Sequence, residues 1–397
     1  MKYLKGLRNY IINSVSILKD WLLKILEKII SLNAVNPAHG GPGEEARANY
    51  IQEILENMGL TVTRYELKDD KGINRPSLIT EIGSGDTIWI IAHIDTVSPG
   101  NGWTGDPFKL RIDGNKVIGR GVNDNGLGII SSLLLLKRII EENIEINYKL
   151  KVGFVADEEA GSKYGLKYLV KKGVFQKGER AIVPDAGKPD GSEVEIAEKG
   201  ILWLKFITKG KQAHGSLPNK GDNAFLKSMR FALDLYETLH KEFCEEDPLF
   251  DPKVSTFEPT KKDKNVDSVN IIPGEDVHYW DCRVLPRYCL EEVLEIVKKV
   301  ATKYDTSYEI LVKEEASNVD PNDWIVQKLV SAIRDELKVE PKIVGIGGGT
   351  FAGILRKIGI PAVVWHIGSD TEHQPDEWEL IDNYIKNANV LLRLLRS

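Results

Sequence analysis

His93 and Asp95 stand at the end of a strongly apolar stretch, residues 87–96. The β-branched and aromatic residues of this stretch predict a strand that is buried on both faces. A histidine and a carboxylate are costly to bury unless they are paired or bind a cation. At the carboxyl end of a strand they would face the crevice in which open α/β sheets bind ligands. The spacing favours a metal ligand, His93, that Asp95 orients, with a simple turn cap as the alternative for this motif alone.

The same arrangement recurs along the chain. Acids or histidines follow further apolar runs or lie in a glycine-rich loop: Glu158 and Glu159 after residues 149–156, Asp124 within 119–126, Asp185 after 181–184, and His373 seven residues beyond the run 360–366. A buried structural histidine would explain one such event, but it does not explain five. The repetition therefore predicts that separate strand ends deliver these side chains to one site.

Two histidines and three carboxylates are more than one catalytic zinc ion needs, because such a site keeps about three protein ligands and an open position. The surplus indicates two metals about 3.5–4 Å apart with a bridging carboxylate. Asp124 is the natural bridge, since its glycine-flanked loop allows close approach of the backbone. Of the adjacent Glu158 and Glu159, one can bind metal while the other acts as general base toward water. The predicted reaction is hydrolysis of an amide or similar carbonyl bond.

Composition narrows the class of protein. A chain of 397 residues exceeds the usual size of one hydrophobic core, so two domains are expected. A net charge of −6 argues against nucleic acid as a partner. Three cysteines without C-x-x-C spacing indicate a reducing, cytoplasmic compartment and a metal held by imidazole and carboxylate. Charged residues interrupt residues 1–30 too often for a membrane span, so no membrane partner is expected.

The order of predicted elements indicates an α/β domain with an insertion. Helix-like and strand-like segments alternate in the first half, which predicts a sheet flanked by helices. From residue 200 the predicted order becomes strand, helix, strand, strand, helix, strand, which fits a ferredoxin-like α+β domain. The second strand of that set is expected at 269–272 and the third at 278–284. We therefore expect a first domain of residues 1–199 plus 312–397, and an inserted domain of residues 200–311.

Eight fragments, taken together, resemble one family. They are HIDTV, GRGVNDNG, DEEAG, PDAG, AHGSLP, VNIIPG, DCRVLP and EHQPDEW, in that order. The chain resembles the acetylornithine deacetylase, succinyl-diaminopimelate desuccinylase and aminoacylase family of di-zinc metallopeptidases from about residue 25 onward. The resemblance implies a mixed sheet flanked by helices, as in zinc peptidases, with the inserted domain as a lid and dimerisation domain.

The resemblance also implies roles for the residues of the site. One Zn²⁺ would be held by His93 and Asp185, and the other by Glu159 and His373. Asp124 would bridge the two ions, which Co²⁺ could replace. Asp95 would orient His93, and Glu158 would be the general base.

Further roles are implied for the inserted domain and for a glycine loop. His214 resembles a histidine that reaches across a homodimer interface to stabilise the developing oxyanion, with a surface histidine as the alternative. Asn270 and Arg283 resemble residues that bind a substrate carboxylate. The alternatives are that Asn270 is a turn residue and that Arg283 forms an ion pair at a strand edge. Gly348, Gly349 and Thr350 resemble a loop that closes over the free end of the substrate.

Two departures from the family pattern bear on function. Asn125-Gly126 follows Asp124 where many relatives have Met-Lys, and Phe351-Ala352 follows the glycine-threonine loop where many have Ser-Asp or Asp-Ala. The first leaves the ligand set intact, and the second leaves the substrate open. The expected substrate is an N-acyl amino acid or a small peptide with a free carboxylate. A dipeptidase or aminopeptidase, or a non-catalytic binding relative, is the alternative.

Overall fold

The computed structural model describes the backbone of residues 2–397 and side chains from residue 16 onward. The chain divides into two compact units. The first unit comprises Met1–Ile196, Val319–Ile343 and Thr350–Ser397, and the second comprises Ala197–Asn318 and Val344–Gly349. The domain boundaries expected from the sequence, after residues 199 and 311, stay a prediction.

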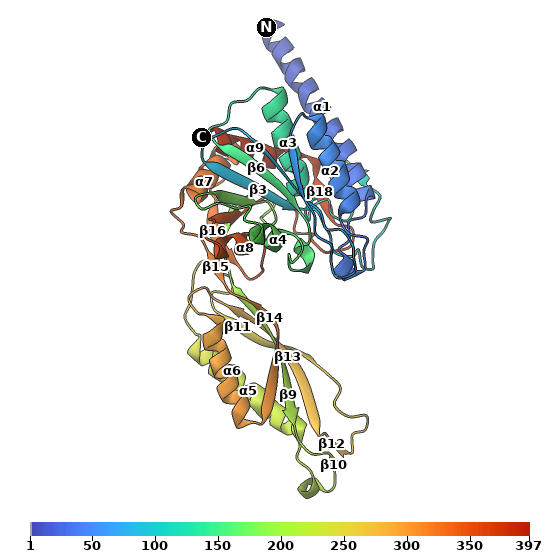
Figure 1. The fold of residues 1–397 in the computed structure, drawn as a ribbon, viewed down its shortest axis with the longest axis vertical. Helices are drawn as coiled ribbons and strands as arrows, with labels where there is room; N and C mark the ends of the chain where they lie inside the picture. The colour runs from blue at the N-terminus through green and yellow to red at the C-terminus, as the bar shows by residue number, and fades with distance from the viewer. Residues whose placement is uncertain (1) are drawn as a thin grey trace. The chain divides into compact units, whose positions relative to one another are not determined.

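A central mixed sheet forms the core of the first unit (Figure 1). Seven of its nine strands, in spatial order, are β1 (Val62–Tyr65), β2 (Ser77–Ile82), β6 (Lys149–Val155), β3 (Thr87–His93), β7 (Arg180–Val183), β17 (Ala362–Val364) and β8 (Glu193–Glu198). β3 is parallel to both β6 and β7, and β17 is parallel to β7. β1, β2 and β8 run antiparallel to their neighbours. The mixed sheet expected from the sequence is confirmed.

Helices cover both faces of this sheet. The helices of the first unit are α1 (Lys2–Ser31), α2 (Glu45–Asn57), α3 (Gly126–Glu141), α4 (Leu166–Lys171), α7 (Trp324–Leu337), α8 (Phe351–Lys357) and α9 (Ile381–Arg396). On one face, Trp89 and Ile91 of β3 belong to a buried cluster with Leu166 of α4 and Leu355 of α8. β3 also contacts α3, which packs against α1 and α9. Because β3 is covered on both sides, its sequence is a continuous apolar run.

A small antiparallel sheet joins distant parts of the first unit. It consists of β4 (Arg111–Asp113), β5 (Lys116–Ile118) and β18 (Trp378–Leu380). Trp378 of β18 lies opposite Ile118 of β5. This pairing brings the segment before β18, which carries His373, to the loop after β5, which carries Asp124.

The second unit contains a four-stranded antiparallel sheet. Its strands, in spatial order, are β11 (Thr256–Lys262), β13 (Glu275–Val284), β9 (Gly200–Lys209) and β14 (Thr306–Glu314). The helices α5 (Ala224–Glu242) and α6 (Leu290–Lys303) share one buried core with this sheet, through residues such as Phe206, Phe231 and Val297. Numbered along the chain, the strand order is 2-3-1-4, which is the ferredoxin-like arrangement expected from the sequence.

One strand of the second unit was misplaced by sequence reasoning. The second strand of the sheet is β11, whereas residues 269–272 contribute only β12 (Ile271–Ile272), which pairs with β10 (Ala213–His214) outside the sheet. β11 is an edge strand in which Phe257 is the one fully buried residue, and Pro259 marks a break in its pairing register. Edge strands carry charges and proline because their outer side faces solvent, so β11 lacks the hydrophobic signal of an inner strand.

The remaining short elements are η1 (Pro37–His39), η2 (Glu158–Ala160), η3 (Pro218–Lys220), β15 (Ser317–Asn318) and β16 (Lys342–Ile346). Near the N-terminus, α1 packs into the first unit through Leu22, Leu26 and Ile29, which are fully buried. Within the described part of the chain, no helix combines the length and the apolar character needed to cross a bilayer.

Candidate metal centre

Three neighbouring parallel strands end at the candidate site. His93 is the last residue of β3, Glu158 and Glu159 follow β6 in η2, and Asp185 follows β7. Because β6, β3 and β7 are adjacent and parallel, their carboxyl ends meet at one edge of the sheet. The loop before α3 adds Asp124 to this edge.

The ligand atoms lie within contact distance of one another. His93 Nε2 is 2.8 Å from Asp124 Oδ1 and 3.1 Å from Asp185 Oδ1. His373 Nε2 is 3.1 Å from Asp124 Oδ2 and 3.3 Å from Glu159 Oε2. The two oxygens of Asp124 therefore face different histidines, which is the arrangement that a bridging carboxylate requires.

Glu158 also belongs to this cluster. Ligand atoms of His93, Asp124 and Glu159 lie within 4.8 Å of one another, and so do those of His93, Glu158 and Asp185. Within the described residues the Glu158 carboxylate forms no hydrogen bond or ion pair, whereas its backbone N–H donates to Asp95 Oδ1 at 3.0 Å. Its main chain is thus fixed while its carboxylate remains available.

Asp95 holds the ring of His93 and the η2 turn together. His93 Nδ1 lies 3.4 Å from Asp95 Oδ1 and 3.2 Å from the Asp95 carbonyl oxygen, and both are acceptors. In the neutral ring that binds a metal, Nδ1 would carry the proton and Nε2 would present its lone pair to the cluster. Asp95 is fully buried, and its Oδ2 accepts the backbone N–H of Glu159 at 3.1 Å. This geometry favours an orienting carboxylate over the turn cap that the motif alone left open.

The loop that carries Asp124 is fixed by a buried glutamate that sequence reasoning missed. Glu377 accepts the backbone N–H groups of Gly121, Asn123 and Asp124 at 2.9–3.0 Å. It also forms a buried ion pair with Arg120 at 2.6 Å. Glu377 lies four residues beyond His373 in the EHQPDEW fragment, but sequence alone gave no sign that its carboxylate points at backbone.

Asn125 gives a structural role to the first departure from the family pattern. Its Nδ2 donates to Asp185 Oδ1 at 2.5 Å, and its Oδ1 accepts the backbone N–H of Gly128 and caps α3. A Cβ atom at position 128 would lie 2.0 Å from Asn125 Oδ1, so glycine is required there. Asn125 thus bonds to the same Asp185 oxygen that lies 3.1 Å from His93 Nε2.

A second buried network lies behind η2, and sequence reasoning missed it too. Asp157 accepts hydrogen bonds from Asn36 at 3.1 Å and from Arg75 at 3.0 Å. Arg75 also binds Glu44 through two nitrogens, at 2.5 and 2.8 Å. These residues come from loops and helix ends without hydrophobic periodicity, so no sequence signal distinguished them from ordinary surface residues.

The residues present fit divalent cations. Four carboxylates and two imidazoles converge without any lysine or arginine among them, and Glu159 Oε1 is buried without a hydrogen-bond partner among the described residues. Buried acids that repel one another need a cation to be stable together. Imidazole nitrogen and carboxylate oxygen, without thiolate, are ligands that suit zinc and cobalt.

The pKa shifts within the cluster also favour a bound cation. Burial alone would lower the pKa of His93, but Asp185 and Asp124 raise that pKa well above its usual value. Burial and the charge of Asp185 raise the pKa of Glu158 well above its usual value. Hydrogen bonds to Asp124 and Glu159 raise the pKa of His373 to about 10. Each shift favours an extra positive charge in the cluster, which is what a bound cation supplies.

His214 and Asn270 lie side by side in the second unit. His214 is in β10 and pairs with Ile271 of β12, while the backbone N–H of Gly215 donates to the Asn270 carbonyl at 2.7 Å. His214 Nδ1 accepts the backbone N–H of Ser216 at 3.2 Å, so in the neutral ring Nε2 carries the proton. The His214 side chain is exposed and presents this donor outward.

Arg283 lies in the same unit but far along the sheet from His214. It is in β13, where its guanidinium binds Asp281 at 2.7 and 3.1 Å and donates to the Gly347 carbonyl at 2.6 Å. The eight residue steps from Glu275, at the other end of β13, span about 27 Å. Gly348 and Gly349 follow Gly347 in the second unit, whereas Thr350 belongs to the first unit and caps α8 by accepting the Ala352 N–H.

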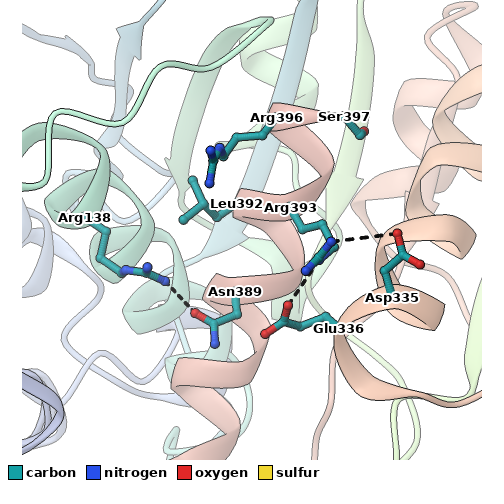
Figure 2. A pocket seen from close by; sticks show the side chains of 8 residues that line it. All are labelled: Arg138, Asp335, Glu336, Asn389, Leu392, Arg393, Arg396 and Ser397. Carbon is teal, nitrogen blue, oxygen red and sulfur yellow. Dashed lines mark hydrogen bonds and ion pairs between the residues drawn. The ribbon is translucent and has the colours of Figure 1, made fainter. Parts of the chain in front are cut away.

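The cavity in Figure 2 is a different kind of feature. It has a volume of about 500 Å³ and is lined by Arg138, Asp335, Glu336, Asn389, Leu392, Arg393, Arg396 and Ser397. Arg393 is paired with Glu336 at 3.2 Å, and Arg138 is paired with Glu142 at 2.9 Å. Its lining residues include no histidine or cysteine, and acids pair with two of its three arginines, so it does not resemble the metal centre described above.

Comparison with known proteins gives the family. A model of peptidase family M20/M25/M40 matches residues 89–397. An uncharacterized metallohydrolase of Methanocaldococcus jannaschii is 43% identical over 403 residues, which cover 94% of this chain and 98% of that protein. A succinyl-diaminopimelate desuccinylase of Nautilia profundicola is 23% identical, over 95% of this chain and 99% of that protein. The aminopeptidase PepT of Bacillus cereus shares the fold, with a TM-score of 0.75 and 18% identity over 95% of this chain and 98% of that one. With its ligand cluster at the edge of the sheet, this chain belongs to the peptidase family M20/M25/M40 and is a hydrolase of the metallopeptidase type.

Proposed function

We propose that this protein hydrolyses the amide bond of an N-acyl amino acid, or of a small peptide with a free carboxylate, with the help of bound metal. The observation that carries the proposal is the convergence of His93, Asp124 and His373 with further acids at one edge of the sheet. Family membership and the desuccinylase among its relatives support this reaction class.

In this proposal each chain holds two Zn²⁺, and Co²⁺ can replace them. His93 and Asp185 would hold one ion, Glu159 and His373 the other, and Asp124 both. When bound, the ions supply Lewis acidity that lowers the pKa of water towards about 7 and polarises the scissile carbonyl.

Glu158 is the proposed general base. One of its carboxylate oxygens takes the proton of the attacking water and then delivers it to the nitrogen of the leaving amine. The fixed backbone and the uncommitted carboxylate of Glu158 support this role, since Asp95 holds its N–H at 3.0 Å. The outward Nε2–H of His214 would stabilise the negative charge that develops on the carbonyl oxygen.

Asn270 and Arg283 are the proposed grips for the substrate carboxylate, and Gly348, Gly349 and Thr350 form the proposed loop over its free end. The planar guanidinium of Arg283 suits two-point binding of a carboxylate. Arg283 now binds Asp281 and the Gly347 carbonyl, which keeps its plane oriented. A substrate carboxylate would have to share that guanidinium with Asp281.

We further propose that the working form is a homodimer. His214 and Asn270 lie beyond one end of the second unit's sheet and Arg283 at the other, about 27 Å away along β13, so one small substrate cannot touch all three in a single chain. A second copy would bring His214 and Asn270 to the site that Arg283 serves. The outer face of α5 supports such a contact, because five large apolar side chains are exposed on it: Phe225, Leu226, Met229, Leu233 and Tyr236.

An aminopeptidase or dipeptidase of the same family is the second candidate. The pairing of Arg283 with Asp281 favours it, because a guanidinium that is already neutralised is less available to a substrate carboxylate. Such an enzyme would recognise a free amino end instead. A relative that only binds its ligand is a less favoured reading, because the ligand cluster and Glu158 are all present.

We also propose a reducing, cytoplasmic compartment, with neither nucleic acid nor membrane as partner. All three cysteines are free, and the net charge of −6 is unfavourable for contact with polyanions.

Metal content and substrate preference test this function together. Protein loaded with zinc or cobalt should bind close to two ions per chain and lose turnover when a chelator is added. A panel of N-succinyl, N-acetyl and dipeptide substrates, each with a free or an amidated carboxylate, should show hydrolysis of the free acids. Arg283→Ala should raise KM for those acids, whereas preference for amidated substrates and indifference to Arg283→Ala would select the aminopeptidase. Full activity without metal would refute the proposal.

A further inference from the structure

We propose that Asn36 is a positioning residue of the metal centre, an inference that rests on the proposed function above. Asn36 caps η1, five residues after the end of α1, and is completely buried. It is not one of the expected ligands, and it is 59 residues from Asp95 in sequence. Its side-chain amide nevertheless lies between the buried carboxylates of Asp95 and Asp157, which flank the η2 turn that carries Glu158 and Glu159.

The hydrogen bonds determine which way the Asn36 amide faces. Its Oδ1 accepts the backbone N–H of Ala38 at 2.9 Å, so its nitrogen faces the two carboxylates. Nδ2 donates to Asp95 Oδ2 at 2.7 Å and to Asp157 Oδ1 at 3.1 Å. An amide nitrogen carries two hydrogen atoms, and both are used here. The position therefore needs one acceptor and two donors without a charge, and the asparagine side chain supplies them.

Asp95 connects Asn36 to three groups of the centre, namely His93, Glu158 and Glu159. Its two oxygens accept the backbone N–H groups of Glu158 at 3.0 Å and Glu159 at 3.1 Å. Its Oδ1 also lies 3.4 Å from Nδ1 of His93. The hydrogen bond from Asn36 to Oδ2 is the shortest of these contacts and adds a side-chain donor that helps to hold the carboxylate in one rotation. A rotated Asp95 would shift the imidazole and both glutamates together.

Asp157 connects Asn36 to the start of the η2 turn. Its backbone is in the left-handed region, with φ of 68°, a conformation that is uncommon for residues other than glycine. Arg75 donates to its Oδ1 at 3.0 Å, and the backbone N–H of Tyr164 donates to its Oδ2 at 2.9 Å. Asn36 is the group that links Asp157 to Asp95, so it ties together both ends of the support under Glu158.

Replacement of a single atom tests this role. Asn36→Asp keeps the shape of the side chain but puts a third carboxylate against Asp95 and Asp157 with no hydrogen atom to share. Asn36→Ala removes the amide and leaves both acids one donor short. Partners behind a metal ligand contribute about 10- to 100-fold in metal affinity. We expect both variants to bind Zn²⁺ at least about 10-fold more weakly in calorimetric titration, and to change the visible absorption spectrum of the Co²⁺-loaded protein.

Asn387→Asp is the matched control for a general loss of stability. Asn387 is equally buried, and its amide donates to the carbonyl oxygens of Ile367 and Asn383, away from the proposed ligands. It should lower Tm as Asn36→Asp does, while keeping wild-type zinc affinity and the wild-type cobalt spectrum.

Two results would overturn the inference, and they differ from failure of the proposed function. Unchanged zinc affinity and cobalt spectrum in both Asn36 variants would show that the amide does not position the centre. The same changes in Asn387→Asp would show that they report only general destabilisation. A wild-type chain that takes up no metal at all would instead refute the proposed function, and this inference with it.

Discussion

At the scale of single residues, the candidate centre contains two kinds of polar group. Some have all their hydrogen-bond partners within the described part of the chain, and others have none there. Asp95 receives bonds from Asn36, Glu158 and Glu159 and has no remaining freedom. Glu159 Oε1 has no partner among the described residues. Side chains whose hydrogen bonds are complete fix the positions of their neighbours. Side chains without a partner are free to bind a cation or to move a proton.

Glu158→Gln is the sharpest single-residue prediction. The amide keeps the size of the side chain but cannot take a proton from water, and general base catalysis contributes about 10²- to 10⁴-fold. We expect kcat to fall by about that factor while metal content, measured by atomic emission, stays at the wild-type value. Wild-type turnover in this variant would exclude Glu158 as the base.

A buried histidine in the second unit predicts how stability depends on pH. Burial lowers the pKa of His278 to about 4, although the charge of Asp276 opposes this. Trp280 Nε1–H donates to His278 Nδ1 at 2.9 Å, which requires the neutral ring. The unfolded chain binds a proton near pH 6.5 while the folded chain does not. Stability is therefore complete above about pH 6.5 and declines as the pH falls towards 4, by up to about 3 kcal/mol.

His278→Asn isolates this contribution, because asparagine can accept the Trp280 hydrogen bond but does not titrate. Urea unfolding of both proteins between pH 4 and pH 7 should give a smaller decline for the variant. Parallel curves for the variant and the wild type would contradict the assignment.

Sequence reasoning found the candidate ligands because histidine, aspartate and glutamate are conspicuous directly after apolar runs. It missed Asn36 and Arg75, because an asparagine before proline and a loop arginine look like ordinary turn or surface residues. Their hydrogen bonds span 59 residues for Asn36 to Asp95 and 82 residues for Arg75 to Asp157. Contacts at that separation leave no periodic pattern in a single sequence.

At the scale of elements, the loop before α3 is held by β18 rather than by its own sequence. β18 pairs with β5 and places Glu377 against three backbone N–H groups of the loop. Burial raises the pKa of Glu377, while Arg120 and those N–H groups act against that rise. Arg120 and Glu377 are almost completely inaccessible to solvent.

Glu377→Ala should therefore destabilise the protein strongly. Removal of one partner of a buried ion pair leaves the other charge unpaired, at a cost of about 3–5 kcal/mol. Urea unfolding should show a loss of that size, and zinc affinity should fall because Asp124 is no longer fixed. Glu340→Gln, which breaks the exposed pair between Arg334 and Glu340, is the control and should leave Tm unchanged. Equal effects from the two variants would argue against the anchoring role of Glu377.

The elements of the first unit were predictable where burial on both faces produced continuous apolar runs, as in β3 and β6. β11 was not, because as an edge strand it exposes lysines and a proline. The order of the strands also follows from pairing that no local segment encodes.

At the scale of the whole molecule, the proposed dimer predicts complementation between two inactive chains. Glu158→Gln inactivates its own centre, whereas His214→Ala would inactivate the centre of its partner. A mixed dimer has one complete site, so random exchange of chains should restore up to about one quarter of the wild-type rate. Activity assays on the two variants, before and after mixing and exchange, measure this directly. No recovery, together with a monomeric mass by light scattering, would remove the dimer proposal.

Charges on the exposed face of α5 provide the control for that experiment. Met229→Glu with Leu233→Glu should dissociate the dimer and abolish complementation without unfolding the chain, since both side chains are already exposed. The charge reversals Lys298→Glu and Lys299→Glu on α6 should leave the mass and the recovery unchanged.

The sequence by itself determined the residue types of the centre, the α/β class and the presence of a ferredoxin-like insertion, because burial writes periodic and continuous patterns into local segments. Only the tertiary structure decided that Asp124 faces two histidines, that Glu377 and Asn36 bond to groups beside the candidate ligands, and that His214 lies beyond the end of the four-stranded sheet opposite Arg283. Those facts depend on strand pairing and side-chain direction, which are set by contacts between distant segments.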